Sequence, residues 1–499
     1  MKRIFARGDF NAFFGLMLDN VTNLVVLTGI LTGVFGYPLK IIMTRMIPAT
    51  ALGVMIGDLV YTYMAYRLMK KEGRDDVTAM PLGLDTPSTV GITLTVLGPV
   101  YLQTKDPYLT LYVGMSVLII MGIIKVILSF LGEYVQKYFP EAGLLGSIGG
   151  IGLALLGFYP MLDVFKLPIV GIVALGIIVY AFFARKQMPF NIPPVFAAVT
   201  LGTILFYLLP ARETITATTT FGFFIPHPDY SFVKGMRLAI NYLPVAIPFG
   251  ILTIVGGINV NESARLAGDN YKTRNILLTE AIATLIAGFC GGVAQSTPYI
   301  GHPAYKRMGA RAGYTLATGL FIGIGGMLGI VGGIVNIIPV AAVAPILIFI
   351  GFEIAEQSYV VCKDEIPAVL FAFIPSIANL VQVQVNTFMG FFGKSVADLS
   401  GDILATYKAI TVLGNGFILT AMLWGSMVSF LIRKNIKGFI FTNTIMIVFT
   451  LFGLIHSINP NGSIYIPKFE INYSTSIAIG YLIFTVLSVL MIKWDKSDR

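Results

Sequence analysis

Two polar segments that contain proline interrupt an otherwise apolar chain, and their residues are of the types that could bind a solute. The first reads MPLGLDTPSTVG (80–91) and the second reads VAQSTPYIGHP (293–303). In each segment, small residues precede a polar residue and a Thr-Pro pair. Proline is favourable in the first helical turn, where its missing N–H costs nothing. We therefore expect extended chain to enter a short helix at Pro87 and at Pro298. The free N–H groups and positive end of each helix would then face an internal cavity.

Two such breaks, one in each half of the chain, indicate a transporter with inverted repeats and a site near the membrane midplane. The alternative is a pair of ordinary proline kinks. Asp85 directly precedes the first short helix, where its carboxylate could hold a cation, bind substrate or cap the helix. Asn259 could face the site or simply end a helix. The candidate substrate-binding residues are Asp85, Thr86, Asn259, Gln295, Ser296, Thr297, Tyr299 and Asn23, and the candidates for a coupling ion are Asp85 and Asp19.

Ionisable side chains are few within the apolar segments. Each is costly in lipid, so each should face a cavity or a partner. The clearest are Asp19, Asp58, Asp85, Lys125, Glu280 and Glu353. The histidines have no companions at metal-ligand spacing, and no phosphate-binding loop or nucleophile elbow occurs. We therefore expect no metal, no cofactor and no enzymatic activity, and we disfavour a membrane-embedded lipid enzyme.

The composition is that of a membrane protein. Of the 499 residues, 56% are hydrophobic and only 12% are charged, whereas a soluble domain carries about 25% charged residues. The mean hydropathy is +0.82. The formal net charge is +9, but the basic residues fall in short loops between apolar spans. Membrane topology explains them better than nucleic-acid binding does, so the expected partner is a lipid bilayer.

Fourteen apolar segments approach or exceed the length of about 17–25 residues that crosses a bilayer. They lie at 12–34, 40–68, 108–131, 142–160, 167–184, 193–210, 238–258, 275–292, 313–335, 338–360, 366–382, 408–432, 437–457 and 474–493. Two further crossings, near 80–103 and 294–307, are broken by Gly and Pro. Loops rich in Lys and Arg alternate with loops that are poor in them. This alternation predicts that both termini lie in the cytoplasm and that the chain spans the cell membrane many times.

Several segments together resemble a known family. The stretch Ala281–Gly292 followed by VAQSTPYIGHPAYKRMGAR is similar to the ninth and tenth helices of the xanthine/uracil permease (nucleobase–ascorbate transporter) family, and also to the related sulfate permeases. DEIPAVLFAFIPSIAN (364–379) and the GLD at 83–85 resemble the adenine/guanine/hypoxanthine permease branch. The resemblance covers roughly residues 12–432.

The resemblance implies seven-plus-seven inverted repeats, with core and gate domains that interleave both repeats. The first repeat would span 1–235 and the second 236–432, with two additional membrane helices in 433–499. Gate-domain dimers are common among such relatives, so a homodimer is an expectation. The acidic residues of the family's eighth and tenth helices fall at Val255 and Ile300 here, and its eighth-helix histidine falls at Asn259.

The sequence thus predicts a secondary transporter for a nucleobase or similar small heterocycle, working by alternating access. Coupling to H⁺ or Na⁺ would run through Asp85. The alternative is an anion transporter or channel of the sulfate-permease type on the same fold.

Overall fold

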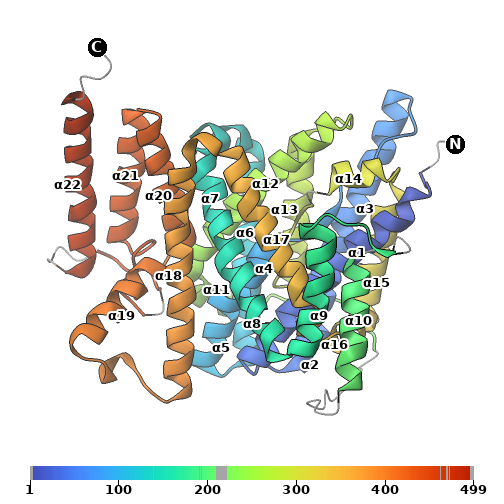
Figure 1. The fold of residues 1–499 in the computed structure, drawn as a ribbon, viewed down its shortest axis with the longest axis horizontal. Helices are drawn as coiled ribbons and strands as arrows, with labels where there is room; N and C mark the ends of the chain where they lie inside the picture. The colour runs from blue at the N-terminus through green and yellow to red at the C-terminus, as the bar shows by residue number, and fades with distance from the viewer. Residues whose placement is uncertain are drawn as a thin grey trace. The chain divides into compact units, whose positions relative to one another are not determined.

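Long apolar helices make up most of the chain (Figure 1). The computed structural model describes residues 4–138, 140–189, 192, 194–209, 222–299, 301–460, 462–467, 470 and 472–494. Within these residues nine helices are long and apolar enough to cross a membrane, or eleven if each of two bent helix pairs is one span. The predicted polytopic α-helical fold class is confirmed.

The helices occupy the predicted spans, and some extend beyond the predicted bounds whereas others end before them. In the first half they are α1 (Gly8–Gly29), α2 (Leu39–Ile41), α3 (Ile47–Glu72), α4 (Thr86–Ile92), α5 (Gly98–Thr104), α6 (Pro107–Tyr138), α7 (Glu141–Ile151), α8 (Tyr159–Lys166), α9 (Pro168–Ile178), α10 (Pro194–Leu208) and α11 (Phe232–Ala239). In the second half they are α12 (Leu243–Leu266), α13 (Thr273–Cys290), α14 (His302–Arg307), α15 (Gly313–Met327), α16 (Ile330–Ile337), α17 (Val340–Val361), α18 (Ile366–Phe391), α19 (Gly401–Gly414), α20 (Phe417–Ile432), α21 (Ile436–Leu451) and α22 (Tyr473–Trp494).

Two predicted single spans are each a pair of bent helices. The span at 313–335 divides into α15 and α16, which meet at 87°, and the span at 408–432 contains the junction of α19 and α20, which meet at 75°. Gly329 and Gly416 stand at these breaks with φ of 74° and 68°. Glycine adopts this left-handed conformation without the steric cost of a Cβ, so the helix ends there.

Separated stretches of the chain fold together into each of two units. Unit 1 contains Met1–Gly132, Pro160–Ile240 and Phe249–Phe349, and unit 2 contains Glu133–Tyr159, Asn241–Pro248 and Ile350–Arg499. The repeat boundaries at 235 and 432 divide the chain differently and stay a prediction.

A short antiparallel ribbon lies inside unit 1. Strand β1 (Leu82–Leu84) pairs with β2 (Ser296–Pro298), and Gly83 stands opposite Thr297. Helices α1 and α3 contact β1, and α13 contacts β2. The two broken segments therefore cross each other although more than 200 residues separate them in the sequence.

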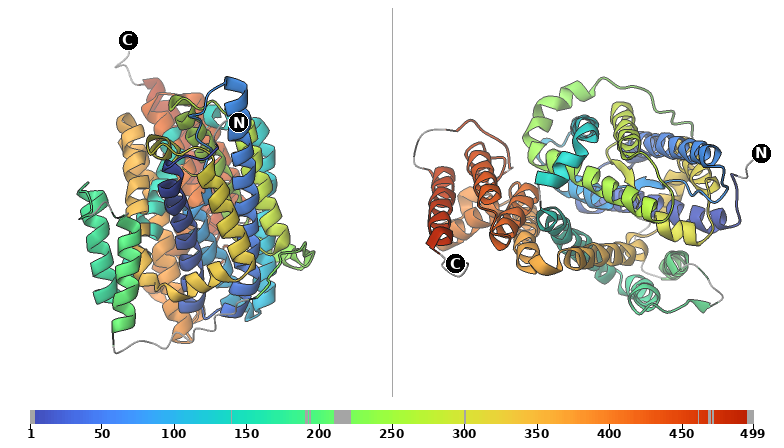
Figure 2. Two further views of the ribbon diagram at one scale, coloured as in Figure 1. Left: turned by 90° about the vertical axis from the view of Figure 1, so that its right-hand side faces the viewer. Right: turned by 90° about the horizontal axis from the view of Figure 1, so that it is seen from above.

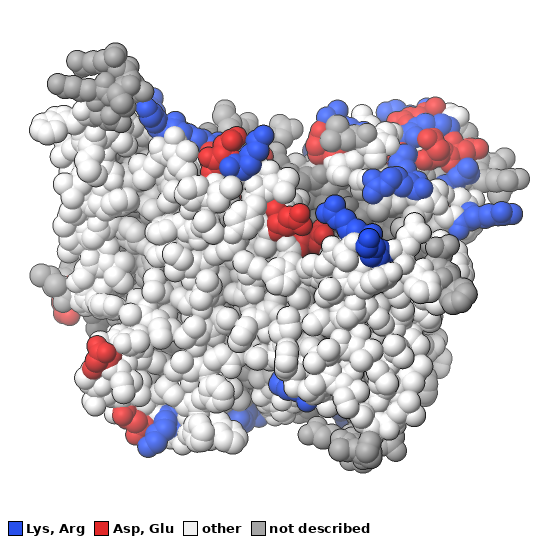
Figure 3. Space-filling view, viewed as in Figure 1, with Lys and Arg blue, Asp and Glu red and all other residues white. Residues whose placement is uncertain are grey.

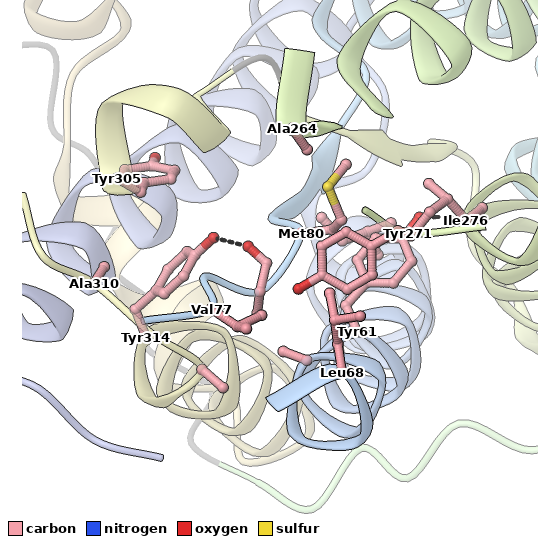
Figure 4. Packing of buried hydrophobic residues seen from close by; sticks show 14 of the residues in the cluster. Tyr61, Leu68, Val77, Met80, Ala264, Tyr271, Ile276, Tyr305, Ala310 and Tyr314 are labelled. Carbon is pink, nitrogen blue, oxygen red and sulfur yellow. Dashed lines mark hydrogen bonds between the residues drawn. The ribbon is translucent and has the colours of Figure 1, made fainter. Parts of the chain in front are cut away.

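A buried cluster rich in tyrosine supports the chain that leads into β1 (Figure 4). The hydroxyls of Tyr271 and Tyr314 each donate a hydrogen bond of 2.6 Å, to the carbonyls of Thr78 and Ala79 respectively. Tyr61 donates to the carbonyl of Ile276 at 3.0 Å. Backbone carbonyls buried away from water need such partners, so Tyr271 and Tyr314 stabilise the segment before β1, while Tyr61 binds a carbonyl of α13.

Small residues bring the helices of unit 2 close together. A Cβ added at Gly143 on α7 would lie 2.6 Å from the carbonyl oxygen of Met422 on α20. Gly146 and Gly150 of the same helix lie equally close to α18, where an added Cβ would stand 3.2 Å and 3.1 Å from the Cα atoms of Val369 and Phe373. Glycine at membrane-helix contacts lets backbones approach and gain van der Waals energy.

The two additional C-terminal helices predicted beyond 432 are present as α21 and α22, which lie side by side (Figures 1 and 2). Trp424 on α20 donates through Nε1 to the hydroxyl of Tyr481 on α22 at 2.7 Å. That hydroxyl lies 2.7 Å from Nε2 of His456, whose Nδ1 is 2.8 Å from the Val412 carbonyl. Because a carbonyl only accepts, Nδ1 carries the proton and Nε2 accepts from Tyr481.

Candidate substrate site at the crossing of two broken segments

The first broken segment enters its helix as the sequence predicts, but the helix is already capped. Asp85 is extended, with φ −75° and ψ 107°, and Pro87 lies in the first turn of α4. The Oδ2 atom of Asp85 accepts the Ser88 amide at 2.9 Å, and its carbonyl accepts the Thr89 amide at 2.9 Å. The expectation of free N–H groups facing a cavity is therefore wrong for Ser88, because the side chain of Asp85 caps its amide, while the Thr89 bond is the first of the helix.

The second broken segment differs from the prediction. Pro298 ends strand β2 and does not begin a helix. The helix α14 begins at His302, with Pro303 in its first turn. Residues 296–298 remain extended because their backbone groups pair with β1, a preference that the Thr-Pro pattern alone does not reveal.

The ribbon brings together two of the predicted site residues. The amide of Asp85 donates to the carbonyl of Gln295 at 3.0 Å. The side-chain Nε2 of Gln295 donates to Oδ2 of Asp85 at 3.3 Å. Asp19 on α1 also belongs to this neighbourhood, since a Cβ added at Gly83 would lie 3.3 Å from its Oδ2. One side of the crossing thus carries two carboxyl groups and an amide.

Side chains from two helices pair with the outer edge of β1. The Leu82 amide donates to Oδ1 of Asp58 on α3 at 3.1 Å, and the Leu84 amide donates to Oδ1 of Asn20 on α1 at 3.0 Å. An unpaired strand edge is not tolerated in a membrane interior. Asp58 and Asn20 therefore act as substitutes for a third strand, a role that depends on packing and has no local sequence pattern.

On the other strand, Lys125 of α6 pairs with β2. Its Nζ donates to the Ser296 carbonyl at 2.7 Å and to Oγ1 of Thr284 at 3.3 Å. Oε2 of Glu280 on α13 lies 3.6 Å away, and both charged side chains are fully buried. The sequence marked Lys125 and Glu280 as ionisable residues within spans but did not place them at the site. Only the fold brings α6 and α13 to the same strand.

Several residues predicted to bind substrate, and Asp19, predicted to hold a coupling ion, present polar atoms without a hydrogen-bond partner among the described residues. These atoms are Asp19 Oδ2, Asn23 Oδ1, Gln295 Oε1 and Ser296 Oγ. Thr86 is buried beside Asp85, and Thr297 is partly exposed. The Tyr299 ring stacks on Tyr305 at a centroid distance of 6.2 Å. Asn259 belongs to α12, and its side chain lies outside the described part of the structure, as does Ile300.

A second polar cluster lies at one end of unit 1, beyond the ends of the spans. Asp269, in the loop between α12 and α13, has a fully buried side chain. Its Oδ1 is 2.8 Å from both Arg74 and Lys306, and its Oδ2 is 3.2 Å from Nε2 of His302 and accepts the Thr78 amide at 3.1 Å. In Figure 3 charged side chains gather near this end of α3.

Asp269 joins both broken segments, because Thr78 precedes β1 and His302 begins the helix after β2. Burial by itself would raise the pKa of Asp269. Hydrogen bonds from His302 and Lys306 outweigh that effect and hold the pKa below its usual value. No group of three or more His, Cys, Asp or Glu side chains that could hold a metal occurs in the described ranges.

The fold is similar to solved structures of anion transporters. The transmembrane domain of BicA, a cyanobacterial bicarbonate transporter, aligns at 18% identity and a TM-score of 0.51, over 77% of this chain and 96% of that one. SLC26A9 aligns at 14% and 0.51, over 75% and 62% of the two chains. The murine Slc26a9 anion transporter in the inward-facing state aligns at 13% and 0.52, over 78% and 68%. No family model and no curated protein sequence matches the chain.

These structures share the seven-plus-seven inverted-repeat transporter fold, and the chain therefore has that fold. They also correct the family resemblance inferred from sequence, because the structural neighbours are anion transporters and not nucleobase permeases. The residues that distinguish nucleobase permeases, the two acids, are absent at Val255 and Ile300.

Proposed function

We propose that this chain is a secondary transporter for a small inorganic anion, working by alternating access in the cell membrane. The observation that carries the proposal is the similarity of its fold to three anion-transporter structures. The crossing in unit 1 supports it further, since its broken segments place extended chain and polar side chains among apolar helices, as a transport site inside a membrane protein requires. Ser296 Oγ is a donor without a partner among the described residues, and an anion could accept from it.

The charges around the crossing favour cation-coupled transport. Among the described residues near the crossing, four carboxyl groups, those of Asp19, Asp58, Asp85 and Glu280, stand against the single ammonium of Lys125. An anion entering this surrounding would be repelled unless a carboxyl group took up H⁺ or Na⁺. We propose Asp85 and Asp19 as the residues that take up the coupling ion. The predicted substrate contacts at Thr86, Asn259, Gln295, Thr297, Tyr299 and Asn23 remain part of this proposal.

Anion flux through the purified protein tests the function. In proteoliposomes we expect saturable uptake of chloride, bicarbonate or sulfate that increases with an imposed Na⁺ or H⁺ gradient. Empty liposomes and liposomes with heat-denatured protein are the controls. Absence of uptake of all three anions under both gradients would contradict the proposal. The ligand should also stabilise the protein, by about 2.7 kcal/mol at 100 times its dissociation constant.

Asp85→Asn is expected to abolish gradient-driven accumulation and to leave anion exchange. Asparagine can still accept the Ser88 amide, so α4 remains capped, but it cannot take up a cation. The measurement compares accumulation and exchange in the same proteoliposomes. Asp75→Asn is the matched control, because Asp75 is exposed. Accumulation at the wild-type level in the Asp85 variant would exclude this residue as the coupling site.

The alternation of basic loops supports an orientation with both termini in the cytoplasm. A protease added to intact cells should then leave an epitope tag at either terminus undigested. It should digest the tag only after the membrane has been permeabilised. Digestion of either epitope on intact cells would contradict this orientation.

A homodimer through the gate domain also stays a proposal, which the mass of the detergent-solubilised protein can test.

A further inference from the structure

Lys125 has an environment unlike that of any other basic residue in the described structure. It is the only lysine or arginine there with a buried side chain, at 0% exposure. Placing a charged side chain within a membrane span costs free energy, so its presence there indicates a functional role. Because Lys125 lies on α6, which carries neither broken segment, its role must act through the residues that it contacts.

The closest contact of Lys125 is a backbone atom of the crossing. Its Nζ donates to the Ser296 carbonyl at 2.7 Å, which is shorter than its 3.6 Å separation from Glu280. Ser296 is opposite Leu84 in the ribbon, and the neighbouring Gln295 holds Asp85 through its carbonyl and its side chain. A change at Lys125 would therefore be transmitted to Asp85 through only two residues, Ser296 of β2 and Gln295, which directly precedes it.

Lys125 also supplies the positive charge of this region. Its ammonium lies 3.6 Å from Oε2 of Glu280 and is connected to Asp85 through Ser296 and Gln295. Among the described residues, no other buried lysine or arginine is available to an anion at the crossing. In a region of low dielectric constant a charge of this kind acts over a longer range than it would in water.

We propose that Lys125 is a positioning residue that holds β2 in place and sets the affinity for the transported anion through its fixed positive charge. This proposal rests on the proposed anion transport. It predicts that the ammonium charge itself affects the KM for the anion, separately from the stability that the Lys125–Glu280 pair contributes.

Two variants separate the effect of the ammonium charge on anion binding from the effect of the Lys125–Glu280 pair on stability. Lys125→Met combined with Glu280→Gln removes both charges, so neither is left buried without a partner. Glu280→Gln alone breaks the same pair but keeps the ammonium. We expect the double variant to remain folded, with an unfolding midpoint at or above that of Glu280→Gln, which leaves the buried ammonium without its counter-charge. Its KM for the best-transported of chloride, bicarbonate and sulfate should rise about tenfold, equivalent to about 1.4 kcal/mol of binding. Glu280→Gln should not raise the KM, and kcat should change less than KM.

Lys125→Arg provides a second test that does not depend on folding of the double variant. Arginine keeps the charge and the hydrogen bond to Ser296, so its KM should stay near the wild-type value. A wild-type KM in the folded double variant, or a tenfold rise in Lys125→Arg, would overturn the role of the charge. If the wild-type protein transports none of the three anions, the proposed function itself fails. Wild-type transport with an unaffected double variant would overturn only the inference about Lys125.

Discussion

Asp269→Asn is expected to lower the free energy of unfolding by about 3 kcal/mol, because it removes the buried carboxylate that accepts hydrogen bonds from two partly exposed cationic side chains. The carboxylate contacts Arg74, Lys306 and His302 while fully buried. It also accepts the Thr78 amide, so its loss should loosen the entry to β1. Thermal unfolding of the purified variant in detergent, followed by near-UV circular dichroism, measures the effect.

Asp76→Asn is the matched control, since Asp76 also contacts Arg74, at 2.9 Å, but its side chain is 69% exposed. An exposed ion pair contributes at most about 1 kcal/mol, so this variant should unfold close to the wild-type midpoint. Equal losses in the two variants would mean that burial of Asp269 has no special effect.

The cluster around Asp269 should also make the stability of the folded protein depend on pH in a known direction. The pKa of Asp269 is lowered in the folded protein, by His302 and Lys306 against the opposing effect of burial. Its contribution to stability is therefore complete above the unfolded pKa of about 3.9 and is lost as the pH falls below it. The difference in unfolding midpoint between wild type and Asp269→Asn should be constant from about pH 5 to 7 and shrink below about pH 4. A difference that grows on acidification would contradict this assignment.

Gly143→Ala is expected to destabilise unit 2 by about 2–3 kcal/mol, through overpacking of two helices. The added Cβ would lie 2.1 Å from Ser426 Oγ and 2.6 Å from the Met422 carbonyl oxygen. The serine can rotate, but the backbone carbonyl cannot, so α7 and α20 must separate. The fraction of monodisperse protein after size-exclusion chromatography and the unfolding midpoint measure the loss.

Gly176→Ala makes the same substitution in a helix where nothing lies within 4 Å of the added Cβ. Alanine is the better helix former by up to about 1 kcal/mol, so this variant should be unchanged or slightly more stable. If both glycine variants lose stability equally, the close contact at Gly143 does not explain its effect.

The membrane-spanning segments could be predicted from the sequence because their cause is local. A run of apolar residues is favourable in lipid wherever it occurs, and the Thr-Pro pairs mark the two breaks within their own neighbourhoods. The same reasoning placed α21 and α22 beyond residue 432. It failed at Pro298, where pairing with β1 keeps the chain extended, and at the bends next to Gly329 and Gly416.

The amino-acid sequence by itself determined that this chain is a helical membrane protein with two broken crossings. Only the tertiary structure decided which polar groups meet there. Lys125 reaches Ser296 across 171 residues, and Gln295 reaches Asp85 across 210. The sequence motifs left nucleobase permeases and sulfate permeases both open, and the arrangement of helices favours the anion-transporter alternative. The physical reason is that the cost of burying a group depends on its own type, whereas the partner that offsets this cost depends on how distant elements pack.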